Sequence, residues 1–372
     1  MSFTLRSIGP ADPESINALH RSVGWPERSE ASWRWLLDNP ARRESGADAG
    51  WLIESDRGEP CGFTGNFVQR FCRGDEILYG ATGFSIIVRP EAQGQSRTLL
   101  RAFTAQPGMF ALYVFNANPA SSPLYRRHDM VAWPPTTHDL KLSWRVDPVT
   151  CAVGRFWREV DRRAPRLIDR SQERLMNPRL AATARLDLPE AVTELTDLGD
   201  GSPYADFWTA LKREGRLIAD RSPAALRWRL ADPDLTLRPL ILVFRRGTAI
   251  TGYAMAMVAK NNPIEPPVLE IIDLVALRDE PAAIEVLAET LLVNAQRLGA
   301  AKMRIQTVHE DLVRRLGPLA FSARHEGGWG HCHVRFATGP GGHHDWTPTP
   351  FDGDYGLSLR PVPIAVAGRE AA

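Results

Sequence analysis

Residues 80–91 read GATGFSIIVRPE and residues 269–280 read LEIIDLVALRDE; both are β-rich runs that end in the same Val/Leu-Arg step. Two further pairs of segments match in the same order. They are 51–63, WLIESDRGEPCGF, with 241–253, ILVFRRGTAITGY, and 32–40, SWRWLLDNP, with 225–233, ALRWRLADP. The partners lie about 190 residues apart each time. We therefore predict two copies of one α/β unit.

The first copy predicts a mixed α/β layer architecture with the order α-α-β-β-β-α-β-α-β. The expected elements are helices at 14–21, 30–38, 97–105 and 119–127 and strands at 51–55, 62–73, 76–88, 109–115 and 137–145. We expect a first domain at 1–147, a helical connector at 148–190, a second domain at 191–337 and a Gly/Pro/Asp-rich tail at 338–372.

The composition is that of an ordinary globular protein. Of the 372 residues 44% are hydrophobic, and the formal net charge is +1, so neither disorder nor a polyanion partner is expected. The four cysteines lie far apart in the sequence, which excludes a disulfide scaffold. The first residues, MSFTLRSIG, lack an apolar signal region, and no apolar run is long enough to span a membrane. We expect a soluble cytoplasmic monomer or homodimer with a small-molecule partner.

Two segments of the first copy have residue types that suit a nucleotide. Residues 88–100, VRPEAQGQSRTLL, join a strand to a helix through Gly, Gln and Ser, so several backbone N–H groups and the positive helix end face one point. Residues 116–130, NANPASSPLYRRHDM, begin a helix at Asn118 and bring Tyr125 near the sheet. The alternatives are a plain turn capped by Ser96 or Gln95, and a tyrosine that only packs.

Together the two segments resemble the GNAT acyltransferase superfamily, whose acyl-CoA site has a Q/R-x-x-G-x-G/A loop and an N-x-x-A/S-x-x-L-Y-x-K/R-x-G-F helix. In the helix motif Asn118, Ser121, Leu124, Tyr125, Arg127 and Met130 match in register, with Asp129 in place of Gly. In the loop motif Gln93 matches, and Ser96 and Thr98 stand where Gly is common. The resemblance implies two GNAT-like mixed-sheet domains in tandem.

The resemblance also implies site residues. The cofactor-binding set is Ile87, Val88, Gln93, Gly94, Gln95, Ser96, Arg97, Thr98, Leu99, Asn118 and Ser121. Tyr125 would be the general acid that protonates the leaving thiolate, and a backbone N–H near Ile87 and Val88 would polarise the thioester carbonyl. Acetyl-CoA or another short acyl-CoA is the expected co-substrate.

The second copy is expected to lack the site. Its corresponding loop, Asp279–Glu285, would place carboxylates against a pyrophosphate, and Val313 stands near the position that needs a tyrosine. By the resemblance to tandem GNAT proteins, we expect this copy to be a structural partner that forms one side of the acceptor cleft.

The general base stays open at this stage. His138 and Asp139 are the preferred pair, and His128, Glu270 and Asp273 are further candidates. Residues His331, Cys332, His333, His343, His344 and Asp345 form a ligand-rich set, but their spacing fits no standard zinc motif, so no metal is expected. Asp352–Tyr355, with Trp346 upstream, is a candidate lining of an acceptor pocket.

The resemblance therefore implies an acyl-CoA-dependent N-acyltransferase that acts on an amine of a small polar acceptor. An overall similarity to tandem GNAT proteins that N-acylate nucleotide-linked amino sugars makes such a sugar the preferred acceptor. A Fem-like or mycothiol-synthase-like transferase is the second hypothesis. The third is a catalytically silent binding module of the same fold.

Overall fold

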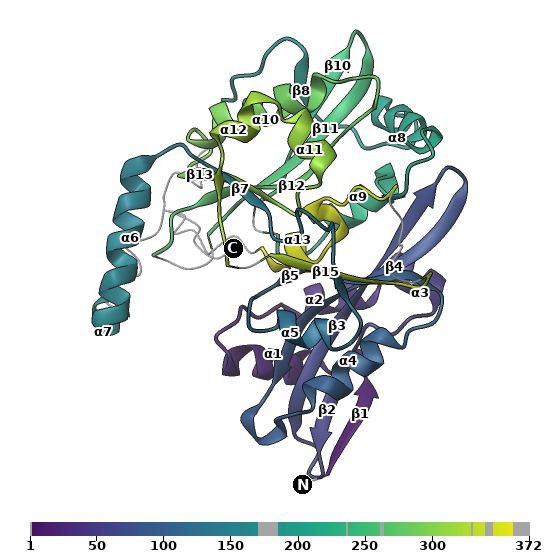
Figure 1. Ribbon diagram of the computed structural model, residues 1–372, viewed down its shortest axis with the longest axis vertical. Helices are drawn as coiled ribbons and strands as arrows, with labels where there is room; N and C mark the ends of the chain where they lie inside the picture. The colour runs from purple at the N-terminus through teal and green to yellow at the C-terminus, as the bar shows by residue number, and fades with distance from the viewer. Residues whose placement is uncertain are drawn as a thin grey trace, which may run out of the picture. The chain divides into compact units, whose positions relative to one another are not determined.

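The computed structural model describes residues 2–169, 185–235, 237–260, 264–328, 330–338 and 345–359 of the chain. They divide into two compact units, each with one mixed β-sheet (Figure 1). Unit 1 consists of Met1–Asp139, Lys212–Asp234 and Gly328–Tyr355, and unit 2 of Leu140–Leu211, Leu235–Gly327 and Gly356–Ala372. Both sheets combine parallel and antiparallel pairs, so the predicted mixed α/β class is confirmed.

The sheet of unit 1 has the strand order β1-β2-β3-β4-β5-β15-β6, with β9 beside β3. Its strands are β1 (Phe3–Ser7), β2 (Gly50–Ser55), β3 (Pro60–Arg73), β4 (Glu76–Val88), β5 (Met109–Ala117), β6 (Val131–Ala132), β9 (Ile218–Ala219) and β15 (His331–Phe336). Neighbours from β1 to β4 are antiparallel, and β4 and β5 are parallel. Strands β2 to β5 confirm four of the five predicted strands. The fifth, predicted at 137–145, forms as β7 (Lys141–Arg145) but pairs with strands of unit 2. Edge strand β1 escaped prediction.

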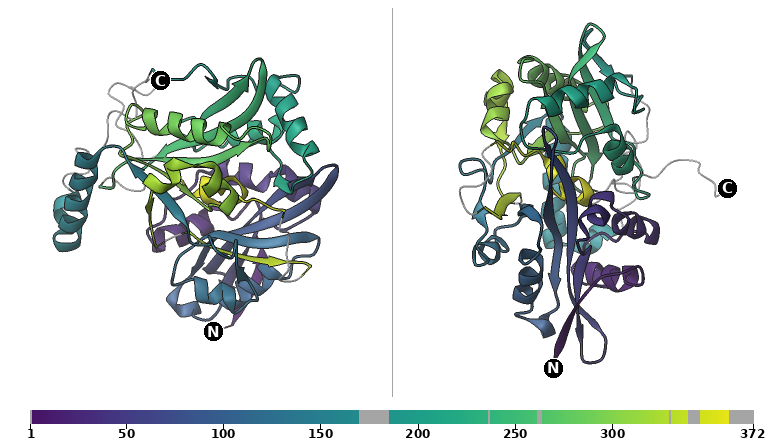
Figure 2. Two further views of the ribbon diagram at one scale, coloured as in Figure 1. Left: turned by 45° about the horizontal axis from the view of Figure 1, so that its top comes forward. Right: turned by 90° about the vertical axis from the view of Figure 1, so that its right-hand side faces the viewer.

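Helices cover both faces of this sheet, as the right-hand view of Figure 2 shows. They are α1 (Pro13–Ser22), α2 (Glu30–Leu37), α3 (Pro40–Ser45), η1 (Pro90–Ala92), α4 (Ser96–Thr104), α5 (Ser122–Arg126), α9 (Pro223–Leu230) and η4 (Pro350–Asp352). On one face Leu99 and Phe103 of α4 are buried in a cluster with Val68 of β3. On the other face Trp33 of α2 packs edge-on against Phe63 of β3 (6.0 Å). Helix α2 begins where the Ser29 hydroxyl accepts a hydrogen bond from the Ser32 N–H.

Two segments from later in the sequence complete unit 1. Strand β15 pairs antiparallel with β5, so the residues after Gly328 extend the sheet that the N-terminal residues begin. Helix α9 is the counterpart of α2 in the sequence match, and Trp228 of α9 stacks on Trp35 of α2 at 4.3 Å. The Trp35 indole N–H also donates to the Trp228 carbonyl (2.9 Å).

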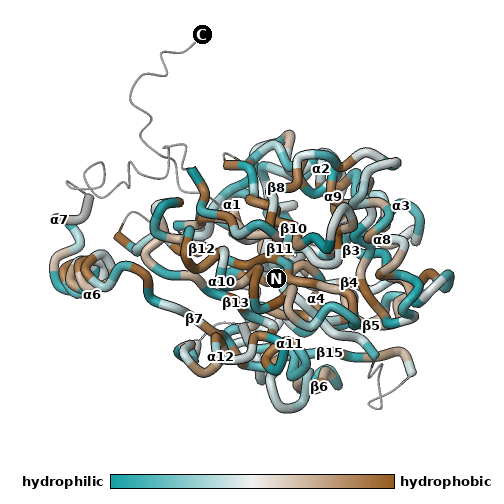
Figure 3. Tube along the Cα trace, turned by 90° about the horizontal axis from the view of Figure 1, so that it is seen from above, coloured by the Kyte–Doolittle hydropathy of each residue, from teal (hydrophilic) through white to brown (hydrophobic). Residues whose placement is uncertain are grey.

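The sheet of unit 2 has the order β14-β7-β13-β12-β11-β10-β8. Its strands are β7 (Lys141–Arg145), β8 (Val192–Glu194), β10 (Leu240–Arg246), β11 (Ala249–Ala259), β12 (Val268–Ala276), β13 (Lys302–Gln306) and β14 (Arg324–His325). Its helices are α6 (Pro148–Arg163), α7 (Pro165–Asp169), α10 (Ala283–Ala295), α11 (Glu310–Arg315) and α12 (Pro318–Ser322), while α8 (Pro203–Arg213) and α13 (Tyr355–Ser358) cross the unit boundaries. Buried α10 residues such as Leu287 and Leu291 pack on β12, whose hydrophobic run is brown in Figure 3.

Candidate active site

Strands β4 and β5 separate part of the way along their length. They pair only from Tyr79 to Thr82 on β4 and from Met109 to Tyr113 on β5, although both strands continue. Strand β4 also contains a bulge, because Phe63 pairs with Ile87 while Gly65 pairs with Phe84. Ser85 in this bulge has φ +52°, which turns β4 away from regular extended geometry. The sheet therefore has an opening beyond Thr82 that exposes backbone groups of both strands.

The Val88 N–H faces this opening. The N–H of Arg89 donates across to the Cys61 carbonyl on β3 (2.8 Å). Because successive N–H groups of a strand alternate between its two edges, the N–H of Ile87 also faces β3 and that of Val88 faces the β5 side. Of the two predicted carbonyl-polarising positions, Val88 is thus the one with an N–H on the open edge.

The loop before α4 has the geometry of an anion site. Gly94 has φ +96° with open space where a side chain would project. The N–H groups of Gly94 and Ser96 have no hydrogen-bond partner within the described part of the chain. Two unpaired N–H groups at the positive end of α4 are suited to phosphate oxygens.

Other residues predicted in this loop have different roles. The N–H groups of Arg97, Thr98 and Leu99 bond to carbonyls of Gly94 and Gln95 within the first turn. The Thr98 hydroxyl donates to the Gln95 side chain (2.8 Å), and the Leu99 side chain is fully buried. Gln93, Gly94 and Arg97 are exposed and can face a ligand from solvent. The described geometry thus assigns the loop's anion contacts to fewer backbone groups than the sequence motif implied.

Asn118 and Ser121 position the helix that carries Tyr125. The Ser121 N–H donates to the Asn118 side-chain oxygen (2.8 Å), and the Asn118 N–H donates to the Ser121 hydroxyl (3.1 Å). These reciprocal bonds form the turn that leads from β5 into α5. Both residues were predicted to bind cofactor, and in this structure their side chains hold the turn.

Tyr125 lies in the apolar cluster beside α4 and is 5% exposed. Its ring stacks on the His333 imidazole of β15 at 5.7 Å. Burial raises the pKa of Tyr125, and the charge of Asp354 raises it further. The phenol is therefore protonated at neutral pH, as a general acid for a thiolate must be.

Asp354 is a buried carboxylate of the segment Asp352–Tyr355, which the sequence suggested as the lining of an acceptor pocket and not as the source of the base. Burial raises the pKa of Tyr125, and the charge of Asp354 raises it further; for Tyr113, burial and then the charge of Asp352 raise the pKa most, and Asp354 adds a smaller contribution in the same direction. Tyr125 belongs to the cluster on the α4 face, whereas Tyr113 follows the opposite side-chain alternation of β5 and donates to the Asp352 carbonyl (2.6 Å). The charge of Asp354 therefore acts on tyrosines of both faces of β5.

The neighbouring tail residues have structural roles. Arg221 donates to the Asp352 carboxylate (2.8 Å), and both side chains are fully buried. The Trp346 indole donates to the same carboxylate (2.9 Å) and packs on Tyr113. The expectation that Trp346 lines an acceptor pocket is therefore wrong, because its ring is fully enclosed in the core. These contacts fix the backbone that carries Asp354.

His138 and Asp139 lie beside β15. The Cys332 N–H donates to the His138 carbonyl (2.7 Å). One ligand atom from each of His138, Asp139 and His331 lies within 4.8 Å of the others. Asp345, which the sequence placed in the same ligand-rich set, instead pairs with Arg73 (2.7 Å), and His343 and His344 lie outside the described residues.

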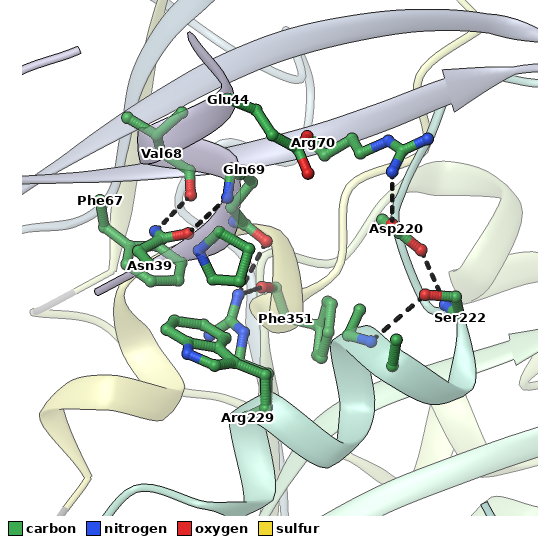
Figure 4. Close-up of a pocket in the computed structure, with 15 residues that line it drawn as sticks. Asn39, Glu44, Phe67, Val68, Gln69, Arg70, Asp220, Ser222, Arg229 and Phe351 are labelled. Atoms are coloured by element: carbon green, nitrogen blue, oxygen red, sulfur yellow. Dashed lines mark hydrogen bonds and ion pairs between the residues drawn. The ribbon is translucent and has the colours of Figure 1, made fainter. Parts of the chain in front are cut away.

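A cavity of about 180 Å³ lies in unit 1 between α3, β3 and α9 (Figure 4). The guanidinium of Arg229 lies between the rings of Phe67 (4.4 Å) and Phe351 (4.5 Å) and donates to the Gln69 side chain (2.7 Å). The carboxylates of Glu44 and Asp220 also line the cavity. Phe67 pairs with Thr82, the last β4 residue before the opening, so the cavity is one strand away from it.

In unit 2, side chains of the unit itself occupy the corresponding junction, which lies between β12 and α10. The Arg315 side chain donates to the carbonyls of Leu277 (2.9 Å) and Glu280 (2.8 Å). The Glu280 carboxylate is buried and pairs with Arg246 (2.9 Å). Two further base candidates are also engaged within unit 2, since Glu270 pairs with Arg304 and Asp273 accepts from Tyr253.

No family model matches the sequence, and no curated protein matches it. Solved structures do match the fold. Yeast (Saccharomyces cerevisiae) N-myristoyltransferase with bound myristoyl-CoA is 10% identical, with a TM-score of 0.53 over 98% of this chain and 85% of that one. A GCN5-related N-acetyltransferase from Anabaena variabilis is 13% identical, with a TM-score of 0.52 over 90% and 73%. A conserved Enterococcus faecalis protein is 11% identical, with a TM-score of 0.53 over 90% and 73%.

The chain therefore has the fold of GNAT-type acyltransferases, which confirms the resemblance at the level of fold. None of the described helices is long and apolar enough to cross a membrane.

Proposed function

We propose that unit 1 is an acyl-CoA-dependent N-acyltransferase. One observation carries the proposal: the opening between β4 and β5 has unpaired N–H groups before α4 on one side and the buried, protonated Tyr125 beside it. A pyrophosphate at Gly94 and Ser96 would let a pantetheine arm follow the opening toward Val88. The fold match to proteins with acyl-CoA chemistry supports this choice.

The residues around the opening can carry out acyl transfer with balanced protons. The acceptor amine nitrogen forms a bond to the thioester carbonyl carbon, and the carbon–sulfur bond breaks. The Val88 N–H would stabilise the negative charge on the carbonyl oxygen. Asp354 would take the proton from the ammonium, and the Tyr125 hydroxyl would give its proton to the departing thiolate.

Asp354 is favoured as the base because its charge acts on Tyr125 itself. His138 and Asp139, preferred from sequence, are the alternative bases. They lie by the strand that carries His333, and His333 in turn stacks on Tyr125.

The cavity between α3, β3 and α9 supports a small polar amine as the acceptor. Its aromatic walls, Phe67, Trp228 and Phe351, offer flat apolar contact, and Glu44 and Asp220 offer negative charge to an amine. A nucleotide-linked amino sugar combines a ring and an amine in this way and remains the proposed acceptor. The four cysteines are free and buried, which supports a reducing cytoplasm as the compartment.

The test is calorimetric titration of acetyl-CoA and CoA into the full chain, followed by thiol release with amino sugars and their nucleotide conjugates. We expect saturable binding of one acetyl-CoA per chain and acceptor-dependent release of CoA. Binding without transfer to any acceptor would favour the silent binding module. Transfer only to peptides or thiol glycosides would favour the Fem-like or mycothiol-synthase-like alternative.

The base is tested in the same assay with Asp354→Asn and His138→Ala. We expect turnover of Asp354→Asn to fall about 100-fold with the acetyl-CoA affinity unchanged, and His138→Ala to keep most of its turnover. The reverse result would assign the base to His138.

A further inference from the structure

Several buried polar atoms that have no hydrogen-bond partner among the described residues lie where the loop before β7 meets β15. They are Nδ1 of His138, the Thr137 hydroxyl and both ring nitrogens of His333. His333 is 3% exposed, so solvent water has little access to its two ring nitrogens and cannot readily supply the missing hydrogen bonds. A buried polar group without a hydrogen bond costs about 1–3 kcal/mol, and such groups in a native fold call for a ligand or an ion.

The backbone holds the residues of this region together. The hydrogen bond from Cys332 N–H to the His138 carbonyl (2.7 Å) fixes the loop against the start of β15. It brings His138 and Asp139, next to each other in sequence, toward His331, which lies almost 200 residues later. One nitrogen of each imidazole and one carboxylate oxygen of Asp139 then lie within 4.8 Å of one another.

We propose that His138, Asp139 and His331 bind a divalent transition-metal ion, with Zn²⁺ as the test ion and water in the remaining position. Two imidazoles and one carboxylate form a donor set that Zn²⁺ takes in sites with an open position. Tetrahedral Zn²⁺ needs donor atoms about 3.4 Å apart, so from separations of at most 4.8 Å the three side chains need to close by no more than about 1.4 Å. Asp139 is exposed and can rotate to do so.

The ion would account for the unpartnered Nδ1 of His138 by taking this nitrogen as a ligand atom. It would also cross-link the loop to β15, the strand that α5, the helix of Tyr125, contacts. This inference does not depend on the acyltransferase proposal, which is carried by the N–H groups before α4 and by Tyr125; the two proposals share only the alternative base pair, His138 and Asp139.

The experiment titrates Zn²⁺ into the chelator-treated full chain by calorimetry and repeats the binding with Co²⁺, whose visible spectrum reports the ligand geometry. We expect one Zn²⁺ per chain with a micromolar or lower Kd, and a Co²⁺ band typical of four or five ligands. His138→Ala and His331→Ala should each weaken Zn²⁺ binding by at least about tenfold. His128→Ala, a part-buried histidine outside the cluster, should leave it unchanged.

Each other outcome overturns the inference. Wild-type protein that binds no Zn²⁺ would show that the three residues form no site. Equal binding by wild type and the His138→Ala/His331→Ala double variant, with both folded by circular dichroism, would place the ion elsewhere. Loss of binding in His343→Ala/His344→Ala but not in His138→Ala would do the same. The acetyl-CoA titration is scored separately and stays informative in every case.

Discussion

The strand-to-helix junctions after β4 in unit 1 and after β12 in unit 2 have the same order of elements but differ in the charged groups that they contain. In unit 1 the helix begins with two unpaired N–H groups and a glycine that has open space around it. In unit 2 the Arg315 side chain bonds the loop carbonyls, and the Glu280 carboxylate is buried in the loop. The loop of unit 1 is open to an anion, whereas the loop of unit 2 already holds an arginine side chain and a buried carboxylate.

The comparison shows that one fold can keep or lose an anion site through a few side chains. A carboxylate at a helix start repels a phosphate, and an arginine that bonds carbonyls stiffens the loop. The helices also differ at the second position that matters, because α5 carries Tyr125 while α11 carries Val313 near the same place. Four predictions test this difference between the units.

The largest effect is expected for Tyr125→Phe. The variant keeps the ring and its contact with His333 but lacks the proton for the thiolate, so we expect turnover to fall about 100- to 1,000-fold. Acetyl-CoA affinity should change less than about twofold. Thiol-release kinetics and calorimetry measure the two quantities.

The matched control is Tyr204→Phe, a buried tyrosine of unit 2, which should keep wild-type turnover. Equal loss in both variants would mean that Tyr125 acts only through stability.

Arg315→Ala should remove the internal closure of the unit 2 junction. Because the carbonyls of Leu277 and Glu280 lose a charged donor, we expect the free energy of unfolding to fall by about 2 kcal/mol in urea denaturation. Arg314→Ala, whose side chain is exposed, should change it by less than about 0.5 kcal/mol.

The stoichiometry of acetyl-CoA should stay at one per chain in Arg315→Ala, because Glu280 remains. A second equivalent would show that the arginine alone blocks the unit 2 junction.

Thr98→Asp should give the unit 1 junction the charge of its unit 2 counterpart. The repulsion between a carboxylate and a pyrophosphate about 8 Å away costs about 2 kcal/mol at an effective dielectric constant near 20. The Kd for acetyl-CoA should therefore rise about 30-fold. The control is Thr98→Asn, which introduces a side chain of the same shape as aspartate without its charge and should change the Kd for acetyl-CoA only a few-fold. An unchanged Kd in Thr98→Asp would place the cofactor away from α4.

The smallest effect concerns the charges of unit 2. Burial alone would raise the pKa of Glu326, but Lys302 and Arg304 together lower it to about 2. A carboxylate with a lowered pKa stabilises the fold fully above its unfolded pKa near 4.5, and this stabilisation is lost as the pH falls toward 2. Glu326 is part-exposed, so we expect a difference of only about 1 kcal/mol between wild type and Glu326→Gln at pH 7.

Urea unfolding at pH 7, 4 and 3 measures this difference. It should shrink steadily with acidity. A difference that is the same at all three values would show that the ion pairs to Lys302 and Arg304 contribute nothing.

The local parts of the candidate site could be read from the sequence. The β4–α4 junction and the helix of Tyr125 are contiguous segments, and their caps and turns depend on neighbours within a few residues. Strands β2, β3 and β4 follow local alternation and turn residues for the same reason. The motif nevertheless predicted too many ligand-binding groups in the loop. It did not show that the N–H groups of Thr98 and Leu99 already donate to the Gln95 carbonyl in the first turn of α4.

The parts of the candidate site that join distant segments of the chain could not be predicted from the sequence. Asp354 lies more than 200 residues after Tyr125, and the charge that it places near the tyrosine depends on how η4 packs against Arg221. His333 reaches Tyr125 only because β15 pairs with β5, and nothing in the residues of either strand specifies that partner. His138 and His331 come together through the hydrogen bond from the Cys332 N–H to the His138 carbonyl, which also joins segments distant in sequence.

The sequence by itself determined the mixed α/β architecture and the contrast between the two junctions, because periodicity and charge are local properties of the chain. The resemblance of a contiguous motif to the GNAT superfamily added Tyr125 as the candidate acid. Only the tertiary structure decided which residues surround that tyrosine, where the sheet opens and which histidines meet. Those contacts join distant segments, and the free energy that selects them comes from burial and strand pairing across the whole unit rather than from any short stretch of sequence.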